Sequence, residues 1–313
     1  MSVVAARPRL GFLGIGWIGR QRLEAVAATG TVDIAGWVDP ALEGGVATLA
    51  DLLEDGTDGI VIATPSGLHE EQAEEALTQG AAVFCQKPLA VNANGAQRVV
   101  AAAQAADRLL AVDFCYRHTQ AAQSLKRAVE DGSLGEILRV ELAFHSAYAP
   151  SQAWSLDPRL AGGGCLLDLG IHLVDLLLWT LGPQQLEPMA TSITGNPLEN
   201  HVSAQLRLES GAPVRLSCSW NLHAGRDCIF EVTLYGARSS VSMHNVHGSF
   251  FDFTTERYVQ AGRTCLAAPP DDWSGRAIVE WATRLAAGEG FDPAAEAYVD
   301  VHRALDAVYE FRQ

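Results

Sequence analysis

The sequence predicts an α/β protein in which a doubly wound parallel sheet comes first and an α+β domain with a mostly antiparallel sheet follows. Three observations support this prediction. At 313 residues the chain can form two domains with separate hydrophobic cores. Up to about residue 117, continuous apolar segments alternate with helical patterns, which is typical of parallel strands covered on both faces. Beyond that point, short segments alternate apolar and polar residues, as antiparallel strands with one covered face do.

The elements follow in order along the chain. We assign residues 1–117 to the first domain and expect its strands at 9–14, 32–39, 58–65, 81–88 and 109–117, with helices between them. We assign residues 118–313 to the second domain, which begins with a helix near 119–131 and ends with a helical pattern at 275–310. Its alternating segments lie at 136–146, 201–210, 213–220 and 229–236. No low-complexity linker separates the domains, so we expect them to enclose a cleft.

The composition favours a soluble protein that acts on small molecules. The net charge of −15 and the pI near 4.9 argue against nucleic acid or an anionic membrane as the main partner, because both repel an acidic chain. The six cysteines show neither C-x-x-C pairing nor metal-ligand spacing, which predicts free thiols, no metal site and a reducing compartment. The sequence shows no secretory leader and no long uncharged apolar run, so we expect a cytoplasmic protein.

A glycine-rich turn follows the first expected strand. Gly14, Gly16 and Gly19 form G-x-G-x-x-G at the start of a helix, and Asp39 ends the next strand. Such a turn lets a pyrophosphate approach the backbone at a helix N-terminus, while the acidic residue binds the adenosine ribose. No Arg or Lys follows at positions 40–42 to neutralise a 2′-phosphate, so NAD is favoured over NADP. A glycine turn without a ligand is the alternative.

A lysine lies at the end of the fourth expected strand, in Gln86-Lys87-Pro88. Open α/β sheets bind their ligands at the carboxyl edge of the strands, and proline restrains the preceding residue to an extended conformation. Thr64 and Pro65 follow the third strand at the same edge, with His69 in the next turn. Two interpretations stay open: Lys87 is a cation directed at a ligand or an ordinary surface lysine, and His69 contacts a ligand or has a structural role.

An apolar helix at residues 162–182 carries Asp168, His172 and Asp175. In an α-helix these residues lie at roughly 0°, 40° and −20° around the axis, which predicts one narrow polar stripe on a buried helix. Either the three side chains satisfy one another in a core, or they line a cleft that holds a polar ligand.

Together these motifs resemble the glucose–fructose oxidoreductase, inositol dehydrogenase and MocA (Gfo/Idh/MocA) family of sugar and cyclitol dehydrogenases. The resemblance covers nearly the whole chain and rests on the order and spacing of its motifs, which are GIGWIG, ATPSGLHEEQAEEAL, CQKPLA, YRHTQAAQSLKRAVEDGSLGEI and GGGCLLDLGIHLVDLLLW. It implies a Rossmann domain and a second domain whose sheet often mediates oligomerisation, so we expect a homodimer or homotetramer.

The resemblance also assigns roles to individual residues. It implies that Lys87, Asp168 and His172 meet at the nicotinamide, with His172 as general base and Lys87 stabilising negative charge on oxygen. Asp168 would bind a neighbouring hydroxyl or steady His172, and Asp175 would hold the imidazole from behind or bond to backbone. The expected cofactor-binding residues are Gly14, Gly16, Trp17, Ile18, Gly19, Asp39, Thr64, Pro65, His69, Gln86 and Lys87.

The chain departs from the family pattern at two places. Gln86 stands where the family usually has glutamate, which alters a partner of the lysine or a cofactor contact, and the segment between Asp39 and Asp58 is short. Substrate recognition is expected from residues beside the helix or the domain joint, with loop packing as the alternative for the two aromatic ones. These residues are Arg117, His118, His145, Tyr148, Trp154 and Arg159, together with Asp168 and His172.

The sequence therefore predicts an NAD-dependent dehydrogenase or reductase that acts on a secondary alcohol or ketone of a sugar, cyclitol or related polyol. A second enzymatic hypothesis is glycoside cleavage in which NAD transiently oxidises the sugar. A third is a regulator that senses the dinucleotide without catalysis. Joint retention of Lys87, Asp168 and His172 argues against the third, because a sensor needs no proton acceptor.

Overall fold

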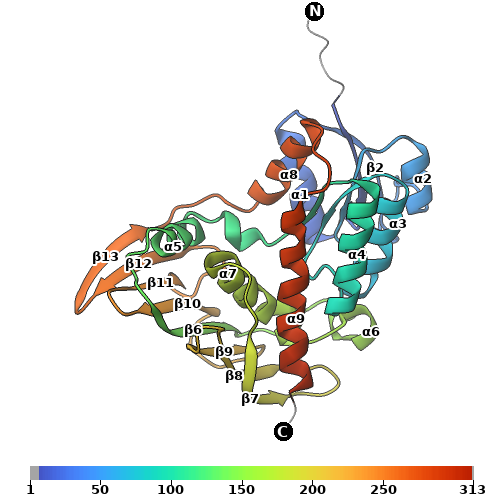
Figure 1. Ribbon diagram of the computed structural model, residues 1–313. Coiled ribbons are helices and arrows are strands. Elements are labelled where there is room, and N and C mark those ends of the chain that lie inside the picture. Colours follow the sequence, from blue (N-terminus) through green and yellow to red (C-terminus); the bar gives the residue numbers. More distant parts are fainter. Residues whose placement is uncertain (1–6, 312–313) are drawn as a thin grey trace, which may run out of the picture. The chain divides into compact units, whose positions relative to one another are not determined.

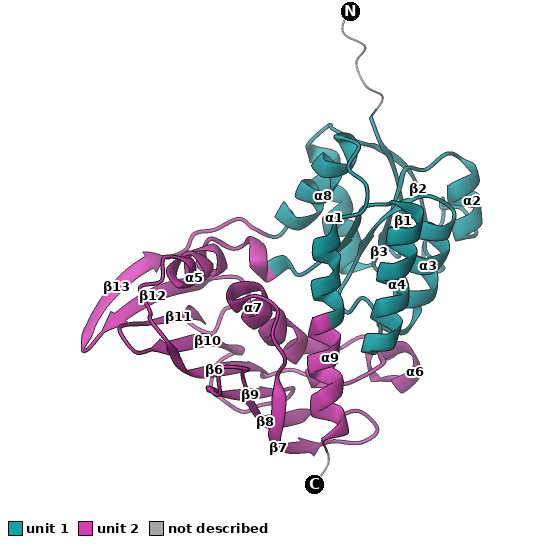
Figure 2. Ribbon diagram, in the orientation of Figure 1, with its two compact units in different colours: residues 1–115, 274–299 teal, residues 116–273, 300–313 magenta. Residues whose placement is uncertain are grey.

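The computed structural model describes residues 7–311 and divides into two compact units. The first contains the chain up to Cys115 together with Ser274–Val299, and the second contains Tyr116–Trp273 and the chain from Asp300 onward (Figure 2). The chain first passes from one unit to the other after Cys115, close to the expected domain boundary at 117. The segment at 274–299, however, belongs to the first unit rather than to the second domain.

The physical reason is the apolar face of helix α8 (Arg276–Ala286), which lies in this segment. Ile278, Trp281 and Ala282 are buried in the core of the first unit, where the Trp281 ring lies 5.6 Å from the ring of Phe84. A core cluster that includes Leu10 surrounds them. An amphipathic pattern shows that a helix has a face to bury, but it does not show which core receives that face.

The sheet of the first unit is parallel throughout, in the order β2-β1-β3-β4-β5, which confirms the doubly wound prediction. Strands β3 and β4 are buried at every residue, because helices cover both faces of the sheet (Figure 1). The elements are β1 (Arg9–Leu13), α1 (Trp17–Ala28), β2 (Asp33–Val38), α2 (Leu49–Glu54), β3 (Gly59–Ile62), α3 (His69–Thr78), β4 (Ala82–Cys85), α4 (Ala93–Ala106), β5 (Leu110–Val112) and α8 (Arg276–Ala286).

The sheet of the second unit has the order β13-β12-β11-β10-β6-β9-β8-β7 and is antiparallel except between β6 and β9, as expected for a mostly antiparallel sheet. Burial alternates along β8 and β9, as in strands with one covered face. The turn at Leu166–Gly170 packs on β9, α7 packs on β6 and β10, and α5 packs on β11, β12 and β13. The elements are α5 (Gln120–Glu130), β6 (Ile137–Ser146), α6 (Pro158–Ala161), α7 (Ile171–Leu181), β7 (Glu187–Thr194), β8 (His201–Arg207), β9 (Pro213–Ser219), β10 (Cys228–Gly236), β11 (Ser240–Asn245), β12 (Phe253–Val259) and β13 (Gly262–Ala267).

The expected single helix at 275–310 is in fact two helices, α8 and α9 (Glu296–Glu310). Gly288 adopts a φ of 76° just after α8, a left-handed conformation that glycine tolerates best. Pro293 then opens a short 3₁₀ turn that leads into α9.

The apolar segment noted in the sequence, Pro158–Leu181, contains α6, then the glycines at 162–164, and then a helix that begins at Cys165 and includes α7. By length and composition alone it could cross a membrane. In the fold, however, 78% of its most apolar 18-residue window is buried. Its packing is therefore that of a core helix of the second unit.

Candidate functional site

The glycine turn between β1 and α1 is shaped by close backbone contacts. Gly14 has a φ of 79°, and a Cβ there would lie 2.7 Å from the carbonyl oxygen of Ala63. A Cβ on Gly19 would lie only 2.1 Å from the carbonyl oxygen of Gly14. These two positions therefore require glycine so that α1 can begin close to the sheet. A Cβ on Gly16, in contrast, would meet no heavy atom of the structure within 4 Å.

The start of α1 is suited to an anion. Its N-cap residue is Gly16, which has no side chain that could accept a hydrogen bond from the first backbone N–H groups. Within the described residues, the first turn, which begins with Trp17 and Ile18, contains no acidic residue. The helix dipole and the first backbone N–H groups therefore remain available to a negatively charged ligand. With the open space at Gly16, these residues fit the pyrophosphate of a dinucleotide. Trp17 is 66% exposed beside them.

Asp39 closes the turn from the side of β2. One of its carboxylate oxygens accepts a hydrogen bond from the backbone N–H of Ile15, and the other accepts one from Ala41, both at 2.9 Å. Because each carboxylate oxygen has two lone pairs, these bonds orient Asp39 and leave it able to accept ribose hydroxyls.

Lys87 follows β4 in a Lys87–Pro88 peptide that is cis. His69 is buried next to this segment, with 1% of its surface exposed. Its Nδ1 lies 2.7 Å from the carbonyl oxygen of Pro88, and its Nε2 lies 2.9 Å from the carbonyl oxygen of Thr64. Burial lowers the pKa of His69 more than these carbonyl groups raise it. His69 therefore links the segment of Thr64 and Pro65 to the segment that contains Lys87 and Pro88. Both ring nitrogens face protein carbonyl groups.

Gln86, which precedes the lysine, is also buried. Its side-chain amide donates to the carboxylate of Asp113, which accepts a second hydrogen bond from Nε of Arg22 at 2.5 Å. Neither Arg22 nor Asp113 was among the site residues predicted from the sequence. A carboxylate directly after the apolar segment LLAV was the available signal, since a buried charge requires a partner.

In the second unit, Asp168 lies on a π-helical turn, Leu166–Gly170, directly before α7. This turn differs from the uniform α-helix assumed for the polar stripe, because each residue of a π-helix advances by a smaller angle. Oδ2 of Asp168 accepts a hydrogen bond of 3.0 Å from the indole N–H of Trp220. Single π turns within α-helices are frequent at functional sites.

His172 lies on the first turn of α7, with 6% of its surface exposed. Its ring meets the ring of Tyr116 in an edge-to-face arrangement at 4.8 Å, and the ring of Phe144 lies 6.2 Å away. Aromatic neighbours therefore fix the plane of the imidazole and shield it from water on these sides.

Asp175 was expected to bind the imidazole of His172 or a backbone group, but its partner in the structure is Arg117. Its carboxylate accepts hydrogen bonds from Nε of Arg117 at 2.9 and 3.1 Å and from Nη2 at 2.5 Å. Burial raises the pKa of Asp175 to about 6, and Arg117 opposes this shift. The guanidinium of Arg117, expected to bind substrate, thus holds a buried carboxylate of its own unit.

Glu199 is a further residue that the sequence analysis missed. Its buried carboxylate accepts hydrogen bonds from the backbone N–H groups of Gly164 at 2.9 Å and Leu166 at 3.1 Å, and from the hydroxyl of Tyr309 at 2.6 Å. A Cβ on Gly164 would lie 2.0 Å from the carbonyl oxygen of Glu199. Glu199 therefore fills the N-terminus of the helix that carries Asp168 and His172.

Two of the other expected substrate residues, His145 and Tyr148, have partners on other elements of the second unit. The ring nitrogens of His145 lie 2.8 and 3.1 Å from serine hydroxyls of β9, and burial lowers its pKa to about 4, with a smaller effect of His201. Tyr148 is 58% exposed, and its hydroxyl donates to Asp227 at 2.5 Å. Short helical segments contain the remaining three, which are His118, Trp154 and Arg159.

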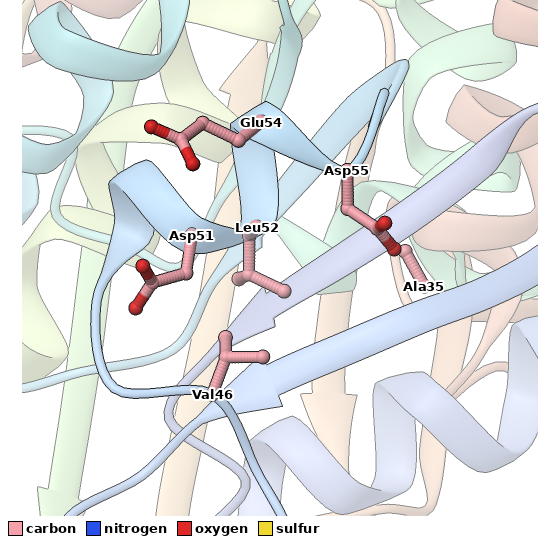
Figure 3. A pocket seen from close by; sticks show the side chains of 6 residues that line it. All are labelled: Ala35, Val46, Asp51, Leu52, Glu54 and Asp55. Carbon is pink, nitrogen blue, oxygen red and sulfur yellow. The ribbon is translucent and has the colours of Figure 1, made fainter.

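A pocket of about 460 Å³ lies beside α2, and none of its lining residues belongs to the glycine turn (Figure 3). Its acidic lining does not suit a phosphate group. Two of its carboxylates already have structural partners, since Asp51 forms a capping box with Thr48 and Asp55 pairs with Arg9. The lining residues are Ala35, Val46, Asp51, Leu52, Glu54 and Asp55, none of which was predicted as a site residue.

Comparison with known proteins matches both parts of the chain to one family. Residues 8–114 match the model described as "Oxidoreductase family, NAD-binding Rossmann fold", and residues 122–242 match the "GFO/IDH/MocA C-terminal domain". The chain is 29% identical over 223 residues to the 1,5-anhydro-D-fructose reductase of Ensifer adhaerens, covering 65% of this chain and 66% of that protein. With inositol 2-dehydrogenase of Rhizobium meliloti it shares 26% identity over 255 residues, covering 76% of each.

Several curated relatives are matched over only 58–66% of their own length. Among solved structures, KijD10, a 3-ketoreductase from Actinomadura kijaniata in complex with NADP and TDP-benzene, superimposes with a TM-score of 0.84. It is 21% identical to this chain, and the match covers 97% of both chains. This likeness supports the fold.

Proposed function

Because this chain belongs to the Gfo/Idh/MocA oxidoreductase family, we propose that it is an NAD(P)-dependent enzyme that interconverts a secondary alcohol and a ketone of a sugar, cyclitol or related polyol. The observation that carries the proposal is His172, an imidazole fixed between Tyr116 and Phe144 on the helix that also presents Asp168. An imidazole suits general acid–base chemistry because its ordinary pKa lies near neutral pH.

In this proposal His172, Lys87 and Asp168 each have a separate role in the reaction. A bound nicotinamide supplies the hydride acceptor or donor. His172 takes the proton of the reacting hydroxyl, and Lys87 stabilises the negative charge that develops on the same oxygen. Asp168, held by the Trp220 indole, accepts a hydrogen bond from a neighbouring substrate hydroxyl and so orients the reacting carbon.

We propose that the cofactor is NAD rather than NADP. Asp39 places a carboxylate at the end of β2, fixed by the N–H groups of Ile15 and Ala41. A 2′-phosphate beside this carboxylate would be repelled, and residues 40–42 provide no cation to compensate.

The test is a panel of sugars, cyclitols and their keto forms with NAD(H) and NADP(H), followed by the absorbance of the reduced nicotinamide. We expect saturable turnover with at least one ketone or alcohol of this class, and its loss in His172→Ala. Tight NADH binding without turnover on any member of the panel would contradict the enzymatic proposal and favour a dinucleotide sensor.

A further inference from the structure

A buried chain of polar groups lies at the ends of β4 and β5 in the first unit. Arg22, Asp113 and Gln86 are 2%, 1% and 9% exposed. The guanidinium of Arg22 and the side-chain amide of Gln86 both donate to Oδ2 of Asp113. Within residues 7–311, Oδ1 of Asp113 is buried without a hydrogen-bond partner. The carboxylate thus retains acceptor capacity in a nearly dry site.

These contacts hold the backbone on one side of Lys87, and His69 holds it on the other. Gln86 is the residue before the lysine, and its side chain is fixed by Asp113. Pro88 is the residue after it, and its carbonyl oxygen faces His69. The lysine therefore stands between two anchored neighbours.

We propose that Arg22 and Asp113 form a positioning device for Lys87, in which Asp113 supplies the negative charge that glutamate usually provides at position 86 in the resembling family. In this chain position 86 carries the neutral amide, and the carboxylate lies one strand away, where Arg22 balances it. This inference rests on the proposed function of Lys87. Arg22 and Asp113 act through Gln86, so both are positioning residues.

The surroundings of Cys115 support a common electrostatic environment. Its pKa is raised to about 12 by burial and then by Asp113, whereas Arg22 and Lys87 lower it. The carboxylate, the guanidinium and the ammonium therefore all act on one thiol.

The decisive experiment is a reciprocal exchange of Gln86→Glu and Asp113→Asn, separately and together. The first variant places two carboxylates side by side, and the second leaves Arg22 without its counter-ion. The double variant retains one carboxylate, one amide and one guanidinium. In the double variant Arg22 can donate to the Asn carbonyl oxygen in place of Oδ2. The Asn amide nitrogen, which takes the place of the unpartnered Oδ1, can donate to the Glu carboxylate once the Glu side chain turns toward it.

The lysine itself can be observed, because Lys87 and Lys126 are the only lysines in the sequence. Protein grown with ¹³Cε-labelled lysine gives one NMR signal from each. Lys126 lies in the second unit, where Nζ donates to the carbonyl oxygen of Trp179, and serves as an internal reference. Asp55→Asn is the matched control, because it removes a carboxylate from an exposed ion pair of the same unit, with Arg9.

We expect each single exchange to move the Lys87 signal and to lower kcat by about 10²-fold, with little change in the KM for NADH, because misplacement of a reacting group by about 1 Å has that effect. The double variant should return the Lys87 signal towards the parent and recover most of kcat. Asp55→Asn should change neither.

Independent losses that multiply in the double variant, or an unmoved Lys87 signal in both single variants, would overturn the proposal. If Asp113→Asn does not fold, the double variant must fold for the proposal to stand. An inactive parent protein would refute the proposed function, whereas the NMR signals and the folding of the variants would still test the positioning device.

Discussion

Among the described helices that follow glycines, two differ in what lies at their first N–H groups. Helix α1 follows Gly16 with no side-chain cap among the described residues and no acidic residue in its first turn. The helix that carries Asp168 and His172 follows Gly164, and the carboxylate of Glu199 accepts hydrogen bonds from its first N–H groups. One helix start remains available to an external anion, and the other is filled by an internal one.

The comparison teaches that a glycine-led helix is an anion site only where the fold provides no anion of its own. At Gly164 an added Cβ would collide with Glu199, so glycine is required there for internal packing. At Gly16 an added Cβ would meet no heavy atom within 4 Å, so packing does not explain this glycine. We therefore expect the first helix start to bind a ligand and the second to position Asp168 and His172.

The largest expected effect separates chemistry from cofactor binding. Replacing His172 with Ala should lower kcat by about 10²- to 10⁴-fold, because the variant loses its proton acceptor. NADH affinity should stay within a few-fold, since the dinucleotide is held at the other helix start. Steady-state kinetics and NADH titration on one preparation check this, with the exposed His223→Ala as control. A destabilised but active His172→Ala protein would mean that His172 is only a core residue.

The second prediction removes the internal anion. Glu199→Ala should lower the free energy of unfolding by about 3 kcal/mol, because two buried N–H groups and the Tyr309 hydroxyl lose their acceptor. Urea unfolding measures the change, and Glu187→Gln, an exposed carboxylate of the same unit, is the control. If Glu199→Ala is as stable as the control, Glu199 does not hold this helix.

The third prediction places an internal anion at the open helix start. Gly16→Asp should weaken NADH binding about tenfold or more through repulsion of the pyrophosphate, while an N-cap aspartate stabilises the helix by a few tenths of a kcal/mol. Binding and stability thus change in opposite directions. Gly16→Asn supplies the same cap without the charge and should weaken binding less. Equal losses in both variants would indicate a steric effect instead.

The smallest expected effect concerns the choice between dinucleotides. Asp39→Ser should reduce the preference for NADH over NADPH by about tenfold, which corresponds to roughly 1.4 kcal/mol, one charge-assisted hydrogen bond. Asp39→Asn removes the charge but keeps one side-chain oxygen, which can accept from the N–H of Ile15 or of Ala41 but not from both, so it retains only part of the turn geometry. Tighter binding of NADPH than NADH by the parent protein would contradict the assignment of NAD.

The sequence predicted the glycine turn well because all of its determinants are local. A strand, three glycines and a helix lie within residues 9–28, and Asp39 ends the neighbouring strand. The alternating segments likewise predicted the antiparallel sheet, because one-sided burial has a period of two. Strands β7, β11, β12 and β13 were not predicted. On β7 and β11 the burial is partial or interrupted, so these strands lack a clean alternation of buried and exposed residues.

The surroundings of the reactive residues were less predictable because they depend on distant parts of the chain. Arg22 and Asp113 are 91 residues apart, and Trp220 is 52 residues from Asp168. An apolar pattern also does not distinguish a π turn from an α-helical one. The expected stripe of Asp168, His172 and Asp175 therefore resolved into three side chains with different partners.

The most direct test of the contrast between the two helix starts is an amide NMR titration with ADP-ribose, which carries the pyrophosphate but lacks the nicotinamide. We predict large shifts for the backbone amides of Gly16, Trp17 and Ile18 at the start of α1. The amides of Gly164 and Leu166, already bonded to Glu199, should stay unchanged. Saturable binding that leaves the α1 amides in place, or moves those of Gly164 and Leu166 instead, would contradict the account.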